Sequence, residues 1–92
     1  MKLEWDAEKA TRNLQKHGIA FEDAALVFYD VGRIEAYDRR GHYAEDRWIT
    51  IGLAWSVLLY VVYTIRNGDT LRLISARKAN AKERQHYREA NT

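Results

Sequence analysis

Positively charged side chains occur where a folded chain could present them to a phosphate group. Near the C-terminus an apolar strand pattern carries Arg72 in its middle, and Arg77 and Lys78 follow at its end. A guanidinium that is held in place by a strand loses little entropy when it binds a phosphate. A second cluster places Lys16 beside His17, the only adjacent Lys-His pair of the chain. Together the two clusters indicate chemistry on RNA.

Metal-free cleavage of RNA requires a base for the 2′-hydroxyl, cations for the charge on the phosphorane, and an acid for the leaving 5′-oxygen. His17 is the best acid-base candidate, because histidine changes its charge near neutral pH. A histidine that closes a helix before Gly18 can instead bond the last carbonyl groups. Lys16 has two interpretations as well, a phosphate clamp or a partner of the helix dipole.

Two arginines are candidates for stabilising the phosphate. Arg77 leads, because it ends a strand and keeps its charge, although an ion pair with Glu83 is a competing interpretation. Arg47 follows Glu45 by two positions, so both side chains are expected on one face of a strand. They could form a catalytic pair or an ordinary salt bridge. We favour a functional Arg47 and leave the role of Glu45 open.

The remaining candidates are contacts to RNA. Arg72 is expected opposite Tyr63, where it could stack on the ring and bind phosphate. Tyr87 could stack on a base or donate a proton, and it could equally anchor the last helix. Arg66, near a turn, is a peripheral RNA contact or a solvated charge. Lys78 is assigned to RNA binding.

Composition limits the classes of protein that are possible. The chain has no cysteine, and its histidines at positions 17, 42 and 86 lack the spacing of metal ligands. We therefore expect no metal and no other cofactor, and we assign no role to His42 or His86. An apolar fraction of 47% in 92 residues predicts one folded domain over residues 1–92.

Two segments bear on location. The first six residues have neither an apolar core nor a small-residue cleavage site, so they do not resemble a signal peptide. Residues 48–65 carry no charge, but Thr50, Gly52 and Ser56 interrupt them and β-branched residues are frequent. Two short strands around a turn fit better than a membrane span. We expect a cytoplasmic protein.

Charge is distributed unevenly although the net charge is only +2. Residues 1–65 hold eight Lys or Arg against ten Asp or Glu, and residues 66–92 hold seven against three. The C-terminal third is therefore a candidate surface for a polyanion such as RNA. A solvated, charged helix is the competing interpretation.

Helices are predicted at both ends of the chain. A helix over 7–17 has Asp6 as its N-cap and Gly18 as its stop, and a second short helix follows over 21–30. The last helix begins after Asn80, with a glutamate in the position of a capping-box partner. It is strongly polar and should pack lightly.

Strands are predicted between these helices. Their ranges are 33–38, 46–52, 57–66 and the segment that begins at residue 70. The fold class is thus α+β, with two short N-terminal helices, a four-stranded antiparallel sheet and a C-terminal helix.

The last two strands are expected to form a hairpin. Asn67-Gly68 favours a two-residue type I′ turn, which would place Tyr63 opposite Arg72 and Leu58 opposite Arg77. In that register one face of the hairpin carries Leu58, Tyr60, Val62, Leu71 and Leu73, and the other carries Leu59, Val61, Tyr63, Ile65 and Ile74. Both faces are apolar, so the last helix or a second protein chain must cover one of them.

A series of residues along the chain carries a resemblance to a known family. In the N-terminal half they are Trp5-Asp6, Lys9, Asn13, Lys16-His17-Gly18-Ile19, Phe21, Ala24, Phe28 and Asp30. In the C-terminal half they are Glu45, Arg47, Ile51-Gly52, Val61-Val62-Tyr63-Thr64, Arg66, Ile74-Ser75-Ala76-Arg77, Ala79, Glu83-Arg84 and Tyr87. In this order they resemble the BrnT toxins over nearly the whole chain. Ala7 and Val31 stand where family members often have proline, which concerns local geometry rather than activity.

The resemblance implies a compact RelE-like α+β domain with endoribonuclease activity. It also implies a BrnA-type antitoxin that silences the toxin, and operator DNA bound only through the antitoxin complex. We expect a toxin that cleaves messenger RNA to a cyclic or 3′-phosphate and inhibits growth, with a dimer or higher assembly possible. The alternatives are a non-enzymatic nucleic-acid- or partner-binding module that serves as a co-repressor, and a bare assembly scaffold.

Overall fold

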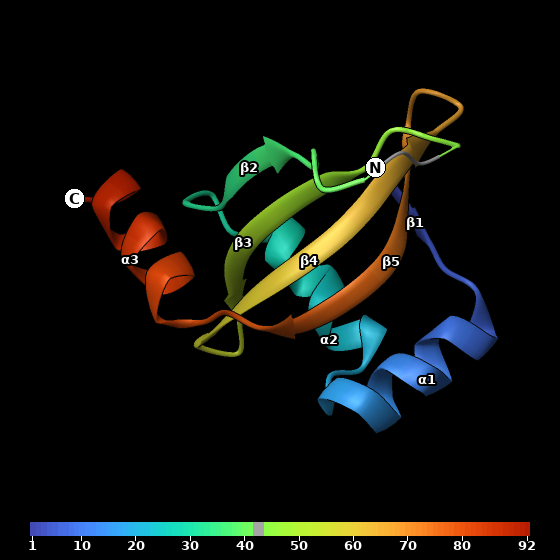
Figure 1. Ribbon diagram of the computed structural model, residues 1–92, viewed down its shortest axis with the longest axis horizontal. Coiled ribbons are helices and arrows are strands. Elements are labelled where there is room, and N and C mark those ends of the chain that lie inside the picture. Colours follow the sequence, from blue (N-terminus) through green and yellow to red (C-terminus); the bar gives the residue numbers. More distant parts are fainter. Residues whose placement is uncertain (42–43) are drawn as a thin grey trace.

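The structure is a computed structural model that describes residues 1–41 and 44–92. Along the chain the elements are β1 (Lys2–Glu4), α1 (Ala7–His17), α2 (Phe21–Ala24), the 3₁₀ helix η1 (Ala25–Tyr29), β2 (Ile34–Tyr37), β3 (Trp48–Ala54), β4 (Val57–Arg66), β5 (Thr70–Lys78) and α3 (Ala81–Ala90). Helices α1 and α3 lie at opposite ends of the long axis, with the curved sheet between them (Figure 1).

The sheet has five strands in the order β1-β5-β4-β3-β2. Strand β1 pairs in parallel with β5, joining Lys2 to Thr70, and the other three pairings are antiparallel. The α+β class and the C-terminal helix are confirmed, but the predicted four-stranded antiparallel sheet is wrong. Strand β1 has only three residues, too few to show a repeating pattern in the sequence.

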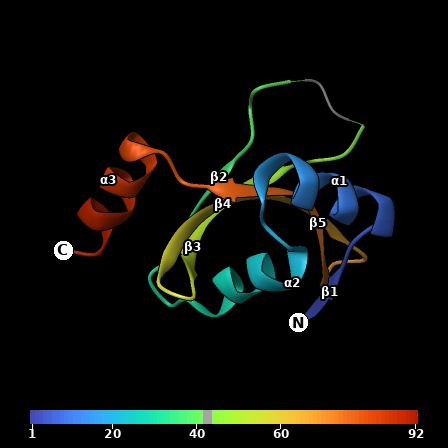
Figure 2. The same cartoon turned by 90° about the horizontal axis from the view of Figure 1, so that it is seen from below.

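The first face of the sheet carries the main core. Helix α2 and η1 lie beneath this face (Figure 2), and their Phe21 and Val27 are fully buried. The ring of Phe28 meets Tyr63 edge to face, with 5.0 Å between centroids. Gly52 allows η1 to approach, because a Cβ there would lie 3.2 Å from the carbonyl oxygen of Val27. The first face is thus closed by short helices.

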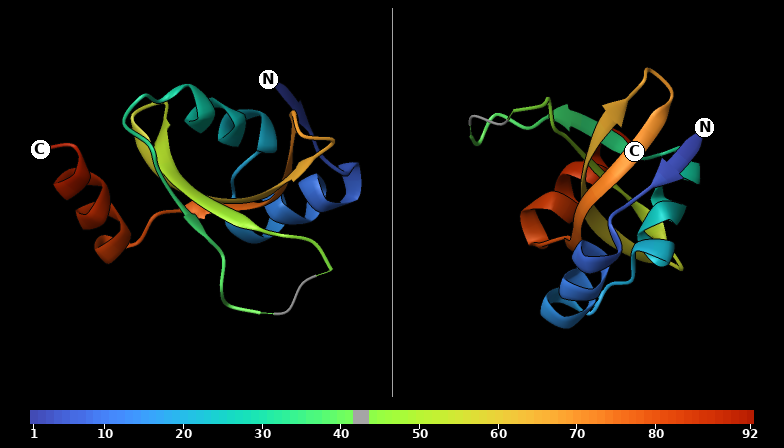
Figure 3. Two further views of the ribbon diagram at one scale, coloured as in Figure 1. Left: turned by 90° about the horizontal axis from the view of Figure 1, so that it is seen from above. Right: turned by 90° about the vertical axis from the view of Figure 1, so that its right-hand side faces the viewer.

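The second face carries a smaller cluster. Its buried members are Ile51, Tyr60, Val62 and Ala79, and α3 contributes Tyr87 at its margin. None of the residues of α3 is itself buried, which confirms that this helix packs lightly. The left view of Figure 3 shows α3 beyond the end of the sheet rather than flat upon it. The second face is therefore only partly covered.

The hairpin between β4 and β5 differs from the expectation. Arg66 pairs with Thr70, so the loop has three residues, and Asn67 and Gly68 both have positive φ. The extra loop residue places Arg72 opposite Thr64 rather than Tyr63. The register shifts again after Tyr63, because Ile74 is an extra residue that forms a bulge.

The third loop residue also reverses the expected faces. Leu71 and Leu73 lie on the first face with Tyr63, and Ile74 lies on the second face with Tyr60. The sequence predicts the opposite arrangement, because a one-residue change of register moves every following side chain to the other side of the sheet. The bulge then shifts the ladder by one more residue, so Arg77 lies opposite Tyr60 rather than Leu58.

The helix ends agree with the sequence. The carboxylate of Asp6 accepts from the Lys9 N–H at 3.0 Å, and Gly18 takes φ 71° after the last turn of α1. Helix α3 has the complete capping box of Asn80 and Glu83. The second predicted helix is present as α2 continued by η1, so its end is tighter than an α-helix.

Helix α1 is fixed to the open edge of β5 by one side chain. Beyond residue 72 the edge of β5 has no strand beside it, and Asn13 fills the position. The Asn13 amide donates to the Ala76 carbonyl at 2.9 Å and accepts from the Ala76 N–H at 3.0 Å. It also donates to the Ile19 carbonyl at 2.9 Å. This residue therefore sets where α1 lies against the sheet.

The uncharged segment 48–65 forms β3 and β4, as expected. Among the residues that the structure describes, no helix is both long and apolar enough to cross a bilayer.

Candidate active site

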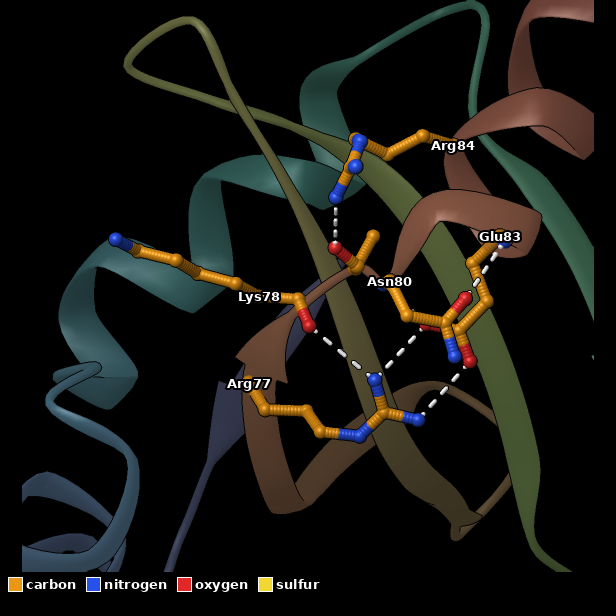
Figure 4. Close-up of polar contacts among 6 residues, drawn as sticks. Arg77, Lys78, Asn80, Glu83 and Arg84 are labelled. Atoms are coloured by element: carbon orange, nitrogen blue, oxygen red, sulfur yellow. Dashed lines mark hydrogen bonds and ion pairs between the residues drawn. The ribbon is translucent and has the colours of Figure 1, made fainter.

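Arg77 ends β5 in a two-pronged contact with α3. Its Nη1 and Nη2 atoms lie 2.8 Å and 2.9 Å from the two carboxylate oxygens of Glu83, and Nη1 also donates to the Lys78 carbonyl at 3.2 Å (Figure 4). The ion pair between Arg77 and Glu83, the interpretation that competes with phosphate binding, is therefore present. The side chain of Arg77 remains 35% exposed, so a ligand can still reach it.

An aromatic ring supports this guanidinium. The Arg77 guanidinium carbon lies 3.9 Å from the centroid of Tyr60, which faces it across the ladder. Arg40, from the segment after β2, lies 5.7 Å from the centroid of the same ring. Two guanidinium groups thus share one ring on the second face, which favours binding of an anion there.

A buried carboxylate orients Arg40. Asp38 is only 1% exposed, and it accepts from Arg40 Nε at 2.8 Å and from Nη2 at 2.9 Å. Tyr60, Arg40 and Asp38 are not among the site residues that the sequence predicts. The pattern around Tyr60 indicates only an apolar strand residue, and nothing in the sequence indicates that Arg40 folds back over it.

Electrostatics fix the charges in this cluster. Hydrogen bonds to Glu83 raise the pKa of Arg77 despite its burial, so it stays cationic. Burial works against the charge of Glu83, but hydrogen bonds from Arg77 and the Asn80 N–H outweigh it and lower the pKa of Glu83. Burial raises the pKa of the Tyr60 phenol, so it stays protonated at neutral pH. The site is an anchored cation on a neutral ring.

A cleft of about 350 Å³ lies beside this cluster, between α3 and the strands β2 and β3. Its floor includes Ile34, Ile49, Ile51 and Tyr60, and Glu83 lies on its wall. The floor is apolar, which suits a flat ring such as a nucleobase more than a second phosphate.

The Lys16-His17 pair lies elsewhere on the second-face side. His17 is half-buried at the end of α1, Lys16 is exposed, and both line a separate groove of about 340 Å³ that includes Ile74 and Ser75. No hydrogen bond links His17 to Arg77 in the part of the chain that the structure describes. The structure thus places the acid-base candidate next to the strand that carries Arg77, and not in contact with it.

Two other candidate arginines are in ion pairs at separate places. Arg72 Nη1 lies 2.6 Å from Glu4 on β1, which joins the two strands. Arg66 lies 3.0 Å from Glu45, so Glu45 pairs with Arg66 and not with Arg47 as one expectation had it.

Arg47 and Lys78 complete the candidates with basic side chains. Arg47 is half-buried just before β3, where its carbonyl accepts from the Asp38 N–H at 2.8 Å. Lys78 is exposed, and its side chain points away from Glu83 (Figure 4). Only the backbone carbonyl of Lys78 contacts Arg77. No described contact brings the side chain of Arg47 or of Lys78 into the cluster of Arg77 and Tyr60.

Tyr87 holds α3 to the chain near residue 30. Its hydroxyl donates to Asp30 at 2.7 Å. Burial and this hydrogen bond raise the pKa of Tyr87 to about 12. The contact that would let Tyr87 anchor the last helix is thus present in the structure.

The other histidines add little. His86 is exposed on α3 and lines the cleft, and His42 lies outside the described residues. Within residues 1–41 and 44–92, no three side chains of His, Asp or Glu are arranged to hold a metal ion.

The α+β fold and the guanidinium groups on its second face define a small protein suited to binding an anion such as a phosphate group. The family model described as "Ribonuclease toxin, BrnT, of type II toxin-antitoxin system" matches residues 5–83, and the chain therefore belongs to the BrnT family. The resemblance seen in the sequence is thereby confirmed.

One solved structure supports this assignment. The chain is similar to the Brucella abortus ribonuclease toxin BrnT, with a TM-score of 0.69 and 28% identity over 87% of this chain and 97% of that one. A comparison with curated protein sequences gives no match.

Proposed function

We propose that this protein is a metal-independent endoribonuclease that cleaves messenger RNA, inhibits translation and growth, and is neutralised by a BrnA-type antitoxin. Membership of a ribonuclease toxin family supports the activity. The observation that carries the proposal is Arg77, a guanidinium held by Glu83 and stacked at 3.9 Å on Tyr60. A pre-positioned cation of this kind stabilises a phosphorane without reorganising.

Arg77 has donors to spare for a phosphate. A guanidinium has five N–H groups, and Glu83 and the Lys78 carbonyl use three of them. The Nε–H and one Nη2–H remain on the side edge, and no acceptor among the described residues bonds to Nε. This edge can bind two phosphate oxygens while Glu83 stays in place.

In the proposed reaction the ribose 2′-hydroxyl loses its proton and its oxygen attacks the adjacent phosphorus. The bond from phosphorus to the 5′-oxygen breaks, the 5′-oxygen takes up a proton, and a 2′,3′-cyclic phosphate is left. We assign stabilisation of the phosphorane to Arg77 and proton transfer to His17, with Lys16 beside it as a phosphate contact. Glu83 is a positioning residue, because both of its oxygens are engaged by Arg77.

The remaining candidates keep peripheral roles in this proposal. Arg66, Arg72 and Lys78 are contacts for the RNA strand. Arg47 is retained as a candidate catalytic residue, and Tyr87 is assigned to anchoring α3, because its hydroxyl is held by Asp30.

The test uses purified protein and a labelled messenger RNA in the presence of EDTA. We expect Arg77→Ala to lower the cleavage rate at least about 100-fold, the size found when one charge-stabilising donor is removed. Arg88→Ala on the exposed side of α3 is the control and should cleave as the unaltered protein does. Wild-type cleavage by a folded Arg77→Ala protein would rule out this assignment, and a metal requirement would show as loss of all activity in EDTA.

A second candidate function has one observation in its favour. The carboxylate of Glu83 occupies the Nη1 and Nη2 atoms of Arg77, as expected if Arg77 serves only as a structural ion pair in a non-enzymatic module. Such a module would bind nucleic acid or an antitoxin and act as a co-repressor. For such a module we expect that the unaltered protein cleaves no RNA and that Arg77→Ala weakens RNA binding. For an enzyme we expect that Arg77→Ala lowers the cleavage rate while the RNA affinity changes only a few-fold.

The proposed partners follow from the two faces of the sheet. The partly covered second face offers apolar surface to an antitoxin, and operator DNA would be reached only through that complex. Co-expression with the antitoxin should abolish growth arrest.

A further inference from the structure

Helix α1 carries a stripe of cations that the proposed chemistry does not use in full. Lys9, Arg12 and Lys16 are three and four residues apart, so they lie along one side of the helix. All three are exposed, and all three line the groove of about 340 Å³ against β5. We call Lys9, Arg12 and Lys16 the α1 stripe.

The α1 stripe differs from the arginines of β4 and β5 in its surroundings. Arg66, Arg72 and Arg77 each have a carboxylate within 3.0 Å. Within the described residues, no ion pair involves any member of the α1 stripe. The acidic residues at the start of α1 are Asp6, whose carboxylate caps the helix, and Glu8, which shares a second depression with Arg12 but forms no ion pair with it in the part of the chain that the structure describes. The stripe is therefore a local excess of positive charge.

The groove opens toward the strand that carries Arg77. Its far wall is Ile74 and Ser75, and Ser75 pairs with Val62 on the second face. Ser75 and Arg77 are two residues apart on β5, so their side chains point to the same side, roughly 7 Å from one another. A polyanion lying along the groove would be led from α1 to the Arg77 guanidinium.

We propose that the α1 stripe and its groove bind the phosphate backbone of the single-stranded RNA on one side of the bond that is cleaved. The stripe covers seven helical steps, roughly 10 Å, which matches about three nucleotides of a stacked strand. One narrow groove beside one helix suits a single strand more than a duplex. This inference rests on the proposed ribonuclease function and adds the path of the substrate.

Binding is measured apart from cleavage, with a fluorescent 15-nucleotide RNA that carries 2′-O-methyl groups and so lacks the attacking hydroxyl. The variant is Lys9→Ala with Arg12→Ala, which leaves Lys16 and His17 intact. Each single-strand phosphate contact contributes roughly 0.7 to the salt slope, so the slope should fall by about 1.4 and the affinity at 0.1 M salt by about 25-fold.

A matched control removes the same charge elsewhere. Lys2→Ala with Arg88→Ala changes two exposed cations that lie away from the groove, and its affinity should stay within about 3-fold of the unaltered protein. A second variant, Lys9→Glu with Arg12→Glu, should bind even more weakly. It is not expected to unfold α1, because Lys9 lies in the first turn, where an acidic residue suits the helix dipole, and because glutamate is a good helix former at the exposed position of Arg12.

Several results would overturn the inference. Equal losses in both pairs of alanine variants would show a general effect of net charge, and unchanged RNA affinity in the α1 variant would show that RNA does not use the groove. If RNA affinity is unchanged while antitoxin binding is lost, the groove binds the protein partner. Binding that depends on the α1 stripe in a wild-type protein that cleaves no RNA would contradict the proposed function, and the groove would then be a site for an RNA strand that is not a substrate.

Discussion

Asn13 shows how a single side chain can take the place of a strand. It is 6% exposed and satisfies both backbone groups of Ala76 at the open edge of β5. A buried N–H or carbonyl without a partner costs about 1–3 kcal/mol. The position of α1, and with it the Lys16-His17 pair, therefore depends on this amide.

Replacing Asn13 should destabilise the protein strongly. We expect Asn13→Ala to lower the free energy of unfolding by about 2–4 kcal/mol, because it leaves the two Ala76 groups unpaired. Urea unfolding followed by circular dichroism measures this change. Gln15→Ala, exposed on the same helix, is the control and should change stability by less than about 0.5 kcal/mol. A cost as small as the control's would mean that water replaces the amide.

Arg77 illustrates two interpretations that are compatible. The sequence offered a phosphate-binding arginine or an ion pair with Glu83, and the structure has the ion pair while the side edge of the guanidinium stays available. Lysine cannot hold Glu83 and a phosphate in this way, since an ammonium group lacks the planar fork of a guanidinium. We expect Arg77→Lys to lose most of the cleavage rate although it keeps the charge, as measured on labelled RNA. Activity within 3-fold of the unaltered protein would show that charge alone suffices.

At the scale of elements, α3 is a helix held at its two ends. Arg77 and Glu83 fasten its start to β5, and Arg84 donates to the Ala79 carbonyl at 2.7 Å. At the other end Tyr87 donates to Asp30, and the Asn91 amide donates to the Gly32 carbonyl at 2.8 Å. With so little buried surface between, these polar contacts decide where α3 lies.

The contact of Tyr87 with Asp30 should make the docking of α3 depend on pH. Hydrogen bonds from Tyr87 and from backbone N–H groups outweigh burial and lower the pKa of Asp30, so its contribution is present above about pH 4 and is lost as the pH falls. The pKa of Tyr87 is raised to about 12, so its contribution is complete below pH 10 and is lost as the pH rises through 12.

We expect Tyr87→Phe to lower the free energy of unfolding by about 1–2 kcal/mol near pH 7 and by less at pH 3, because the contribution of the Asp30 charge falls as the pH drops below the ordinary pKa of 3.8. Urea unfolding at the two pH values measures the difference. Tyr29→Phe is the control, because Tyr29 is 71% exposed. An equal loss at both pH values would mean that the hydroxyl contributes without the charge of Asp30.

Gly32 permits the close approach of α3. A Cβ there would lie 2.5 Å from Asn91 Oδ1 and 3.0 Å from the Tyr87 hydroxyl. We expect Gly32→Ala to displace the end of α3, to speed hydrogen exchange of its last turn and to cost about 1 kcal/mol, because flexible side-chain ends can move aside. Val31→Ala, at a fully exposed neighbour, should leave that exchange unchanged. Unaltered exchange in Gly32→Ala would show that the contact is unimportant.

The sequence predicted the elements whose signals are local. The caps at Asp6, Gly18 and Asn80 mark helix ends because they satisfy backbone groups within a few residues. Strand β1 was missed because it depends on pairing with a segment nearly 70 positions away. The bulge at Ile74 was missed for a related reason, since its register is set by packing on both faces rather than by the turn.

The candidate site was predicted less completely than the fold. Arg77 was identified because a cation at the end of a strand is visible in the sequence. Tyr60 and Arg40 were not, because their contact needs both the bulge and the return of the segment after β2. Long-range geometry therefore decides which of the many cations share a site.

For the whole molecule, the two faces of the sheet are unequal. The first face has a full core under α2 and η1, and the second has a small cluster partly covered by α3. Stability should therefore reside mainly in the first face, while the second is the surface that can change its covering.

Removing α3 should leave a folded protein with an exposed apolar face. We expect residues 1–79 to keep the circular dichroism of the sheet, to unfold cooperatively at lower urea, and to bind a hydrophobic dye and self-associate through Ile51, Tyr60 and Val62. Light scattering and dye fluorescence measure this against the full chain. An unfolded spectrum would show that α3 is required for folding, and a monomer that binds no dye would show that the second face needs no cover.

The bulge at Ile74 gives β5 one residue more than the strand it pairs with. Between the pairs that Leu73 and Ala76 form with β4, β5 has Ile74 and Ser75 where β4 has only Val62. Deleting Ile74 would remove the bulge and leave Ser75, Ala76 and Arg77 opposite the same residues of β4 as now. Arg77 would therefore keep its side of the sheet, and relatives that lack one residue at this point of β5 should still present an arginine beside Tyr60.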